Sequence, residues 1–135
     1  MTQAPAASAA IRLVQPATHT RLTTQTAGME RVEVLSDPDV WVGVTRTAPG
    51  STSGWHHHGD YSTYIYVQAG SARFEFGPRG QDSCRATAGD LLHVPRGAVH
   101  REANDGTEES VLLIFRVARH ADAGEPVYNV DGPPD

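Results

Sequence analysis

The sequence contains a single cysteine, Cys84, which excludes a disulfide within the chain. Nothing in the cysteine content therefore requires an oxidising compartment. The sequence alone shows no environment that would lower the pKa of this thiol. We therefore expect a small, buried and unreactive side chain.

Positive charge is also scarce, with eleven Lys and Arg residues against sixteen Asp and Glu residues and a formal net charge of -5. The chain has no basic run and no cluster of cations among aromatic residues. Nucleic acid and anionic membrane surfaces are therefore poor candidate partners. No apolar run approaches the roughly 18 residues that suggest a membrane span.

The N-terminal residues do not have the pattern of a secretory signal, because Arg12 interrupts the best apolar stretch. We therefore expect a cytoplasmic protein. With 135 residues, the chain is long enough for one domain with a single hydrophobic core. The composition predicts a flexible segment over residues 1–20, one domain over 21–120 and an extended tail over 121–135.

Short segments of β type follow one another between turns that are rich in glycine and proline. No stretch has a convincing helical period flanked by capping residues. Strands spaced 8 to 12 residues apart predict an all-β sandwich, jelly roll or small barrel. The expected strands are 31–35, 40–47, 62–69, 72–76, 84–87, 91–94 and 110–117.

Successive side chains of a strand point to opposite faces of the sheet, and this predicts which side chains of two strands face inward. Phe74 and Phe76 share one face of their strand, so we expect both in the core. Tyr64 and Tyr66 lie on the face opposite to Ile65 and its neighbours. They are expected to pack against another sheet or a partner chain.

Three consecutive histidines occupy positions 56 to 58. If this stretch is extended, His56 and His58 point to one side of the sheet and His57 points to the other. Two imidazoles at this spacing can reach one divalent ion at about 2.0 to 2.1 Å. A solvated histidine run in a surface loop is the alternative, and the residues of this stretch alone do not decide between them.

The wider pattern resembles the two motifs of the cupin superfamily. The stretch GDLLHVPRGAVHREAN has the spacing of the second motif, and the residues around the histidine run have most of the first. The resemblance implies an all-β jelly-roll β-barrel, also called a double-stranded β-helix, with a metal inside its wider end. The matching positions are Gly50, His56, His58 and Gly70 in the first motif and Gly89, Pro95, Gly97, His100 and Asn104 in the second.

One element of the first motif is missing. The family's glutamate falls at Thr63 with one motif spacing and at Ser62 with the other, and neither hydroxyl is a usual ligand for a divalent metal. Three alternatives follow: a site with three neutral histidines, a site completed by another acid, or a barrel that has lost its metal. Glu102 is the best substitute acid because it shares a face with His100, and Asp60 is the second.

The resemblance implies a metal centre formed by His56, His58 and His100. It favours a dioxygenase-type oxidoreductase that acts on a small organic substrate, with Glu102 as a candidate catalytic residue. Fe2+ is the favoured metal, and Mn2+, Ni2+, Zn2+ and Cu2+ also suit imidazole ligands. A metal-assisted isomerase, cyclase or lyase and a non-catalytic binding module are the alternatives, and a homodimer is expected.

Overall fold

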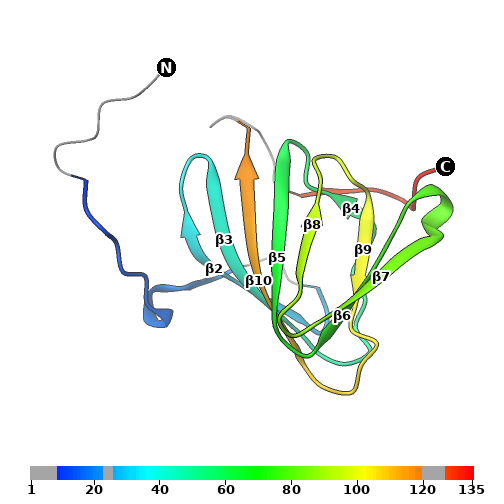
Figure 1. Ribbon diagram of the computed structural model, residues 1–135, viewed down its shortest axis with the longest axis horizontal. Helices are drawn as coiled ribbons and strands as arrows, with labels where there is room; N and C mark the ends of the chain where they lie inside the picture. The colour runs from blue at the N-terminus through cyan, green and yellow to red at the C-terminus, as the bar shows by residue number, and fades with distance from the viewer. Residues whose placement is uncertain (1–8, 23–25, 120–126) are drawn as a thin grey trace.

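The computed structural model describes residues 9–22, 26–119 and 127–135, which form two antiparallel β-sheets (Figure 1). The first sheet has the strand order β1-β2-β3-β10-β5-β8. Its strands are β1 (Thr20–Arg21), β2 (Met29–Ser36), β3 (Val40–Thr47), β5 (Tyr61–Ala69), β8 (Leu91–Val94) and β10 (Ser110–Ala118).

The second sheet has the order β11-β4-β9-β6-β7. Its strands are β4 (His56–His57), β6 (Ser71–Phe76), β7 (Asp82–Thr87), β9 (His100–Ala103) and β11 (Tyr128–Asn129). Two short 3-10 turns, η1 (Pro16–Thr18) and η2 (Pro78–Gly80), are the helical elements of the described chain, and no helix in that part could cross a membrane. The expected all-β jelly roll is confirmed.

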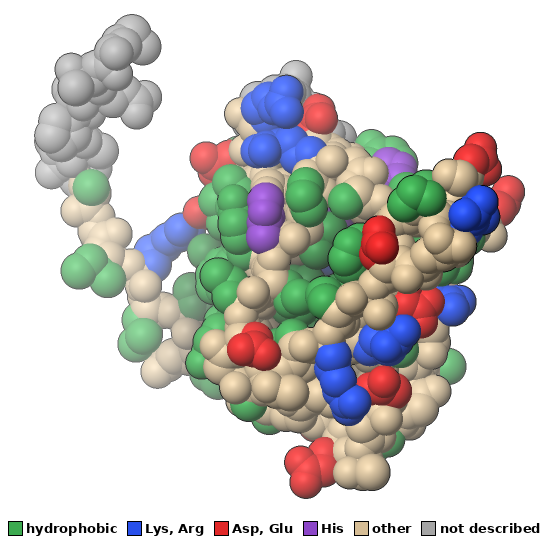
Figure 2. All heavy atoms as spheres, turned by 45° about the vertical axis from the view of Figure 1, so that its right-hand side comes forward, with side chains coloured by type: hydrophobic (Ala, Val, Ile, Leu, Met, Phe, Trp, Pro, Cys, Tyr) green, Lys and Arg blue, Asp and Glu red, His purple; other side chains and the backbone are tan. Residues whose placement is uncertain are grey.

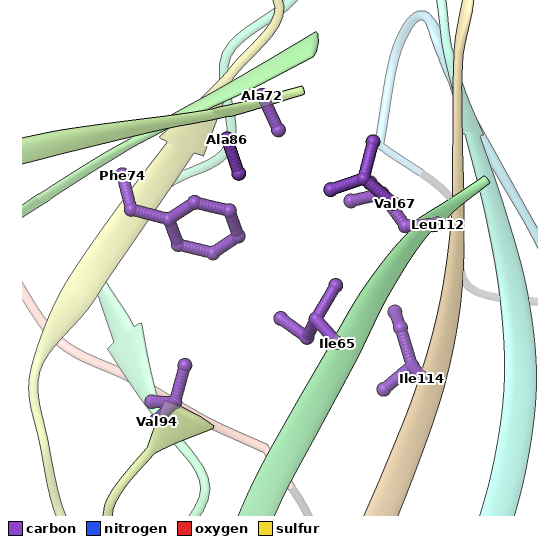
Figure 3. Close-up of a cluster of buried hydrophobic side chains, with 8 residues drawn as sticks. All are labelled: Ile65, Val67, Ala72, Phe74, Ala86, Val94, Leu112 and Ile114. Carbon is purple, nitrogen blue, oxygen red and sulfur yellow. The ribbon is translucent and has the colours of Figure 1, made fainter. Parts of the chain in front are cut away.

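The two sheets enclose one apolar core (Figure 3). Side chains from β5 and β10 face those from β6 and β7 across the interior, because alternate residues of each strand point inward. Burial of these apolar surfaces supplies most of the free energy that holds the sheets together. The buried cluster consists of Ile65, Val67, Ala72, Phe74, Ala86, Val94, Leu112 and Ile114.

The predicted inward faces are largely confirmed. Phe74 is buried, and Tyr64 and Tyr66 lie on the outer face of β5. The prediction for Phe76 is wrong, because β6 ends at this residue and leaves its side chain 37% exposed. Tyr64 stacks on the ring of His93 at 4.8 Å rather than on another sheet of the described chain.

The expectation of a buried thiol is also wrong, because Cys84 is exposed. It lies in β7, which is the edge strand of its sheet, and Ala86 is the residue of this strand that reaches the core. Partial burial still raises the pKa of the Cys84 thiol. The thiol is therefore protonated at neutral pH, the less reactive of its two states.

The two ends of the described chain are both attached to the barrel. Arg12 forms a salt bridge of 2.8 Å with Asp37, just after β2. At the other end, β11 pairs with β4, so that Tyr128 lies opposite His57. Residues 1–8 and 120–126, which belong to the predicted flexible segments or border them, lie outside the described residues. The predicted domain limits therefore stay a prediction.

The outer surface carries mixed charge. On the face drawn in Figure 2, acidic and basic side chains are interspersed among apolar ones. This distribution agrees with the absence of a basic run from the sequence.

Candidate metal centre

Three histidines converge at one end of the barrel. His56 and His100 are opposite one another where β4 pairs with β9, and His58 follows β4 directly. One ring nitrogen of each histidine lies within 4.8 Å of those of the other two. The ring centroids are separated by 4.4 Å for His56 and His100 and by 5.1 Å for the other two pairs. This separation lets all three nitrogens approach one ion with small adjustments.

Hydrogen bonds orient two of these rings. His56 Nδ1 donates to the carbonyl oxygen of Gly54, and His100 Nδ1 donates to that of Ala98, both at 2.9 Å. A carbonyl oxygen can only accept, so each Nδ1 carries the hydrogen and each Nε2 keeps its lone pair. Histidines that bind a metal usually donate the hydrogen of their other ring nitrogen to a protein acceptor in this way, which fixes the orientation of the ring.

Burial keeps the His100 ring uncharged. It is the main cause that lowers the pKa of His100, and repulsion from His56 lowers it further. His100 is therefore neutral at neutral pH, as a metal ligand must be. All three rings are buried.

His57 lies outside the cluster, as alternation along the strand predicts. Its Nδ1 accepts a hydrogen bond of 3.1 Å from the backbone N–H of Gly59, and its ring stacks on Tyr128 at 4.9 Å. His57 therefore connects β4 to the C-terminal strand.

Hydrogen bonds join the turn at residues 59–60 to the turn at residues 96–97 beside the site. The N–H of Gly97 donates to the carbonyl oxygen of Gly59 at 3.0 Å, and Arg96 Nε donates to that of Asp60 at 2.9 Å. Gly97 has a φ of +72°, which favours glycine because it lacks a Cβ. These hydrogen bonds hold the segment before His100 against the segment after His58.

The two candidate substitute acids lie outside the three-histidine cluster. Asp60 is exposed in its turn. Glu102 is buried on the inner face of β9. Its side chain lines the cavity beside the histidines, where it can act on a bound molecule.

The position of the missing glutamate is also inside the barrel. Thr63 is 1% exposed and lines the cavity, and its Oγ1 has no hydrogen-bond partner among the described residues. Ser62 points to the other side of β5, where its Oγ bonds to His93 Nε2 at 2.7 Å. The motif spacing that ends at Thr63 is therefore the one that the structure supports.

A cavity of about 700 Å³ opens beside the histidines. Its wall combines apolar side chains with ionisable ones, which suits a small organic molecule that also carries polar groups. The residues that matter for its chemistry are Glu33, Trp41, His56, His58, Thr63, Ile65, Glu102, Ile114 and Arg116.

Sequence reasoning missed Arg116. This residue is buried on the inner face of β10 and lines the cavity. The signal was available, because Arg116 is the single charged residue in the segment from 110 to 118, which is otherwise almost entirely apolar. Burying a charged side chain in such a strand costs free energy unless the charge has a partner, so its presence indicates a function.

Comparison with known families identifies the class of protein. The family described as "Cupin domain" matches residues 43–116, which is more than half of the chain. The chain therefore belongs to the cupin family. No curated protein matches the chain significantly.

Solved structures agree on the fold. An uncharacterized conserved protein with a double-stranded β-helix domain from Klebsiella pneumoniae is 23% identical, with 87% of this chain and 90% of that chain covered and a TM-score of 0.65. KdgF from Halomonas sp. is 19% identical, with coverage of 80% and 96% and a TM-score of 0.65. A predicted oxalate decarboxylase from Thermotoga maritima is 20% identical, with coverage of 79% and 99% and a TM-score of 0.66. At these identities the matches establish the fold alone.

Proposed function

We propose that this cupin is a metal-dependent enzyme, a dioxygenase-type oxidoreductase that acts on a small organic substrate. The observation that carries the proposal is the convergence of His56, His58 and His100, which are buried beside a cavity of about 700 Å³ and which no carboxylate of the described residues joins. Fe2+ is the proposed metal, and the other divalent transition metals compatible with imidazole remain candidates.

His56, His58 and His100 would hold the ion as neutral ligands, so that its positive charge would not be reduced by the protein. When bound, the ion would supply a site where O₂ and a chelating substrate meet. Residues of the protein would contact the substrate and transfer protons. Trp41, Ile65 and Ile114 line the cavity and offer apolar surface to a substrate. Glu102 lines the same cavity, and we propose that it takes up or returns a proton.

A metal-assisted lyase is the second candidate. One structure with the same fold is a predicted oxalate decarboxylase, whose name implies cleavage of a carbon–carbon bond. In this case the ion would act only as a Lewis acid, and O₂ would not be consumed.

Oxygen consumption separates these candidates. We expect the iron-loaded protein to take up O₂ in an oxygen-electrode assay with a member of a panel of thiols, β-diketones and flavonols. The His100→Ala variant, treated in the same way, should show no uptake. Turnover of any panel member under nitrogen, with no uptake in air, would contradict the dioxygenase proposal and favour the lyase.

We also propose a cytoplasmic homodimer. The outer face of β5 and β8 supports a dimer, because Tyr66 is 41% exposed and lies opposite Leu91, which is 65% exposed. Exposed apolar surface of this kind often marks an interface. Light scattering at micromolar concentration should give about twice the chain mass of 14.5 kDa. A monomer alone would contradict the dimer.

A further inference from the structure

Arg116 occupies an unusual place for a cation. It lies in β10, a central strand between β3 and β5, and its side chain is 8% exposed. The inner positions before it on the same strand hold Leu112 and Ile114. A buried guanidinium in this row costs free energy unless the protein or a ligand supplies a partner for its charge.

The residues around Arg116 fix the position of its guanidinium but leave its Nε without a hydrogen-bond partner in the described part of the chain. Its guanidinium lies 4.5 Å from the ring centroid of Trp41, and Trp41 Nε1 donates a hydrogen bond of 2.8 Å to Glu33. Stacking on an aromatic ring fixes the plane of the guanidinium and leaves its N–H groups available. Arg116 Nε has no hydrogen-bond partner among the described residues. Glu102 attracts the guanidinium electrostatically, but the pair is not in salt-bridge contact.

The pairing of the strands relates Arg116 to the missing glutamate. Arg116 lies directly opposite Thr63 on β5 and opposite Trp41 on β3. Residues opposite one another on antiparallel strands have Cβ atoms about 4.5 to 5.5 Å apart. A glutamate at position 63 would therefore be next to the guanidinium. With threonine there, two neighbouring buried polar groups, Thr63 Oγ1 and Arg116 Nε, both lack a hydrogen-bond partner in the described part of the chain.

We propose that the molecule bound in this cavity carries a carboxylate, and that Arg116 and Thr63 bind it where the cupin motif has its glutamate. The carboxylate of the ligand then supplies the negative charge that a glutamate at position 63 would otherwise provide. This inference rests on the proposed function, because the same cavity contains His56 and His58.

The charge and shape of the site support this assignment. Burial lowers the pKa of Arg116 to about 10, so the guanidinium is still protonated at neutral pH. A planar guanidinium binds a carboxylate through two parallel hydrogen bonds, and Thr63 Oγ1 can add a third. The apolar side chains of Ile65, Ile114 and Trp41 line the same cavity, so the ligand is an organic acid rather than an inorganic anion.

The test measures binding by titration calorimetry, with malonate, succinate and glutarate and with the diamide of each. The series varies the distance between the two ends, and the diamides remove both charges at nearly constant shape, so that no carboxylate is left for Arg116. We expect wild type to bind at least one diacid about 10- to 100-fold more tightly than its diamide. Arg116→Met should lower the affinity for this diacid about 10-fold or more and leave the affinity for the diamide unchanged. Arg46→Met, which removes an exposed arginine from the neighbouring strand, should leave both affinities unchanged.

A second variant tests the link to the missing glutamate. In Thr63→Glu the new carboxylate should occupy Arg116 and lower diacid affinity to the level of Arg116→Met, with bound metal retained or increased. Arg116→Lys, which keeps the charge in a smaller and less directional group, should lie between wild type and Arg116→Met. Unchanged diacid affinity in Arg116→Met, or no diacid binding by wild type, would overturn the inference.

The metal content of each protein separates this inference from the proposed function. A wild type that holds metal, together with an Arg116→Met variant that binds diacids equally well, would contradict the inference and leave the metal centre intact. Diacid binding that depends on Arg116 in a wild type unable to hold metal would support the inference and contradict the proposed function.

Discussion

Replacing His100 with alanine is expected to lower the affinity for a divalent metal by at least about 100-fold. The imidazole nitrogens of His56, His58 and His100 lie within 4.8 Å of one another, and no carboxylate of the described chain joins them. Each histidine is therefore one third of the available ligand set. His56→Ala and His58→Ala should lose metal to the same degree, as measured by elemental analysis after dialysis against a weak chelator.

His57→Ala is the matched control for these variants. His57 is adjacent in sequence, but its ring stacks on Tyr128, outside the cluster. The variant should keep its metal. Equal metal retention in all four variants would refute the assignment of the ligands.

Replacing Asn104 with aspartate is expected to lower the free energy of unfolding by about 2 to 4 kcal/mol. Asn104 is 1% exposed, and its Nδ2 donates to the carbonyl oxygens of Thr47 and Glu108 at 2.9 and 2.7 Å. Its Oδ1 accepts from the N–H of Gly106 at 3.0 Å. Aspartate keeps the shape and the acceptor but has no donor for the two carbonyl groups. Urea denaturation of both proteins measures the difference.

Gln68→Glu provides the matched control, since it makes the same change from amide to carboxylate at an exposed position of β5. It should change the free energy of unfolding by less than about 0.5 kcal/mol. A stability loss as small as this in Asn104→Asp would show that the motif asparagine does not hold the loop between β9 and β10.

Sequence patterns predicted much of the fold and of the site. All seven expected strands are present, because alternation and turn residues are local signals that the chain displays directly. The separation of His57 from His56 and His58 followed from the same alternation. The resemblance to the cupin motifs added His100, which is more than forty residues away in the sequence.

The remaining features depend on pairing between distant segments. The strand β11 has two residues, too few to show a period, and it forms only against β4. The exposure of Cys84 follows from the position of β7 at a sheet edge, which no local pattern reveals. The role that we propose for Arg116 depends on the strand register, which pairs it with Thr63.

A crystal structure of the iron-loaded protein, with anomalous scattering to locate the ion, tests the central claim most directly. We predict one ion bound by ring nitrogens of His56, His58 and His100, with no protein carboxylate in contact with it. An ion bound by the carboxylate of Glu102, or one located away from the three histidines, would contradict the assignment of a three-histidine metal centre.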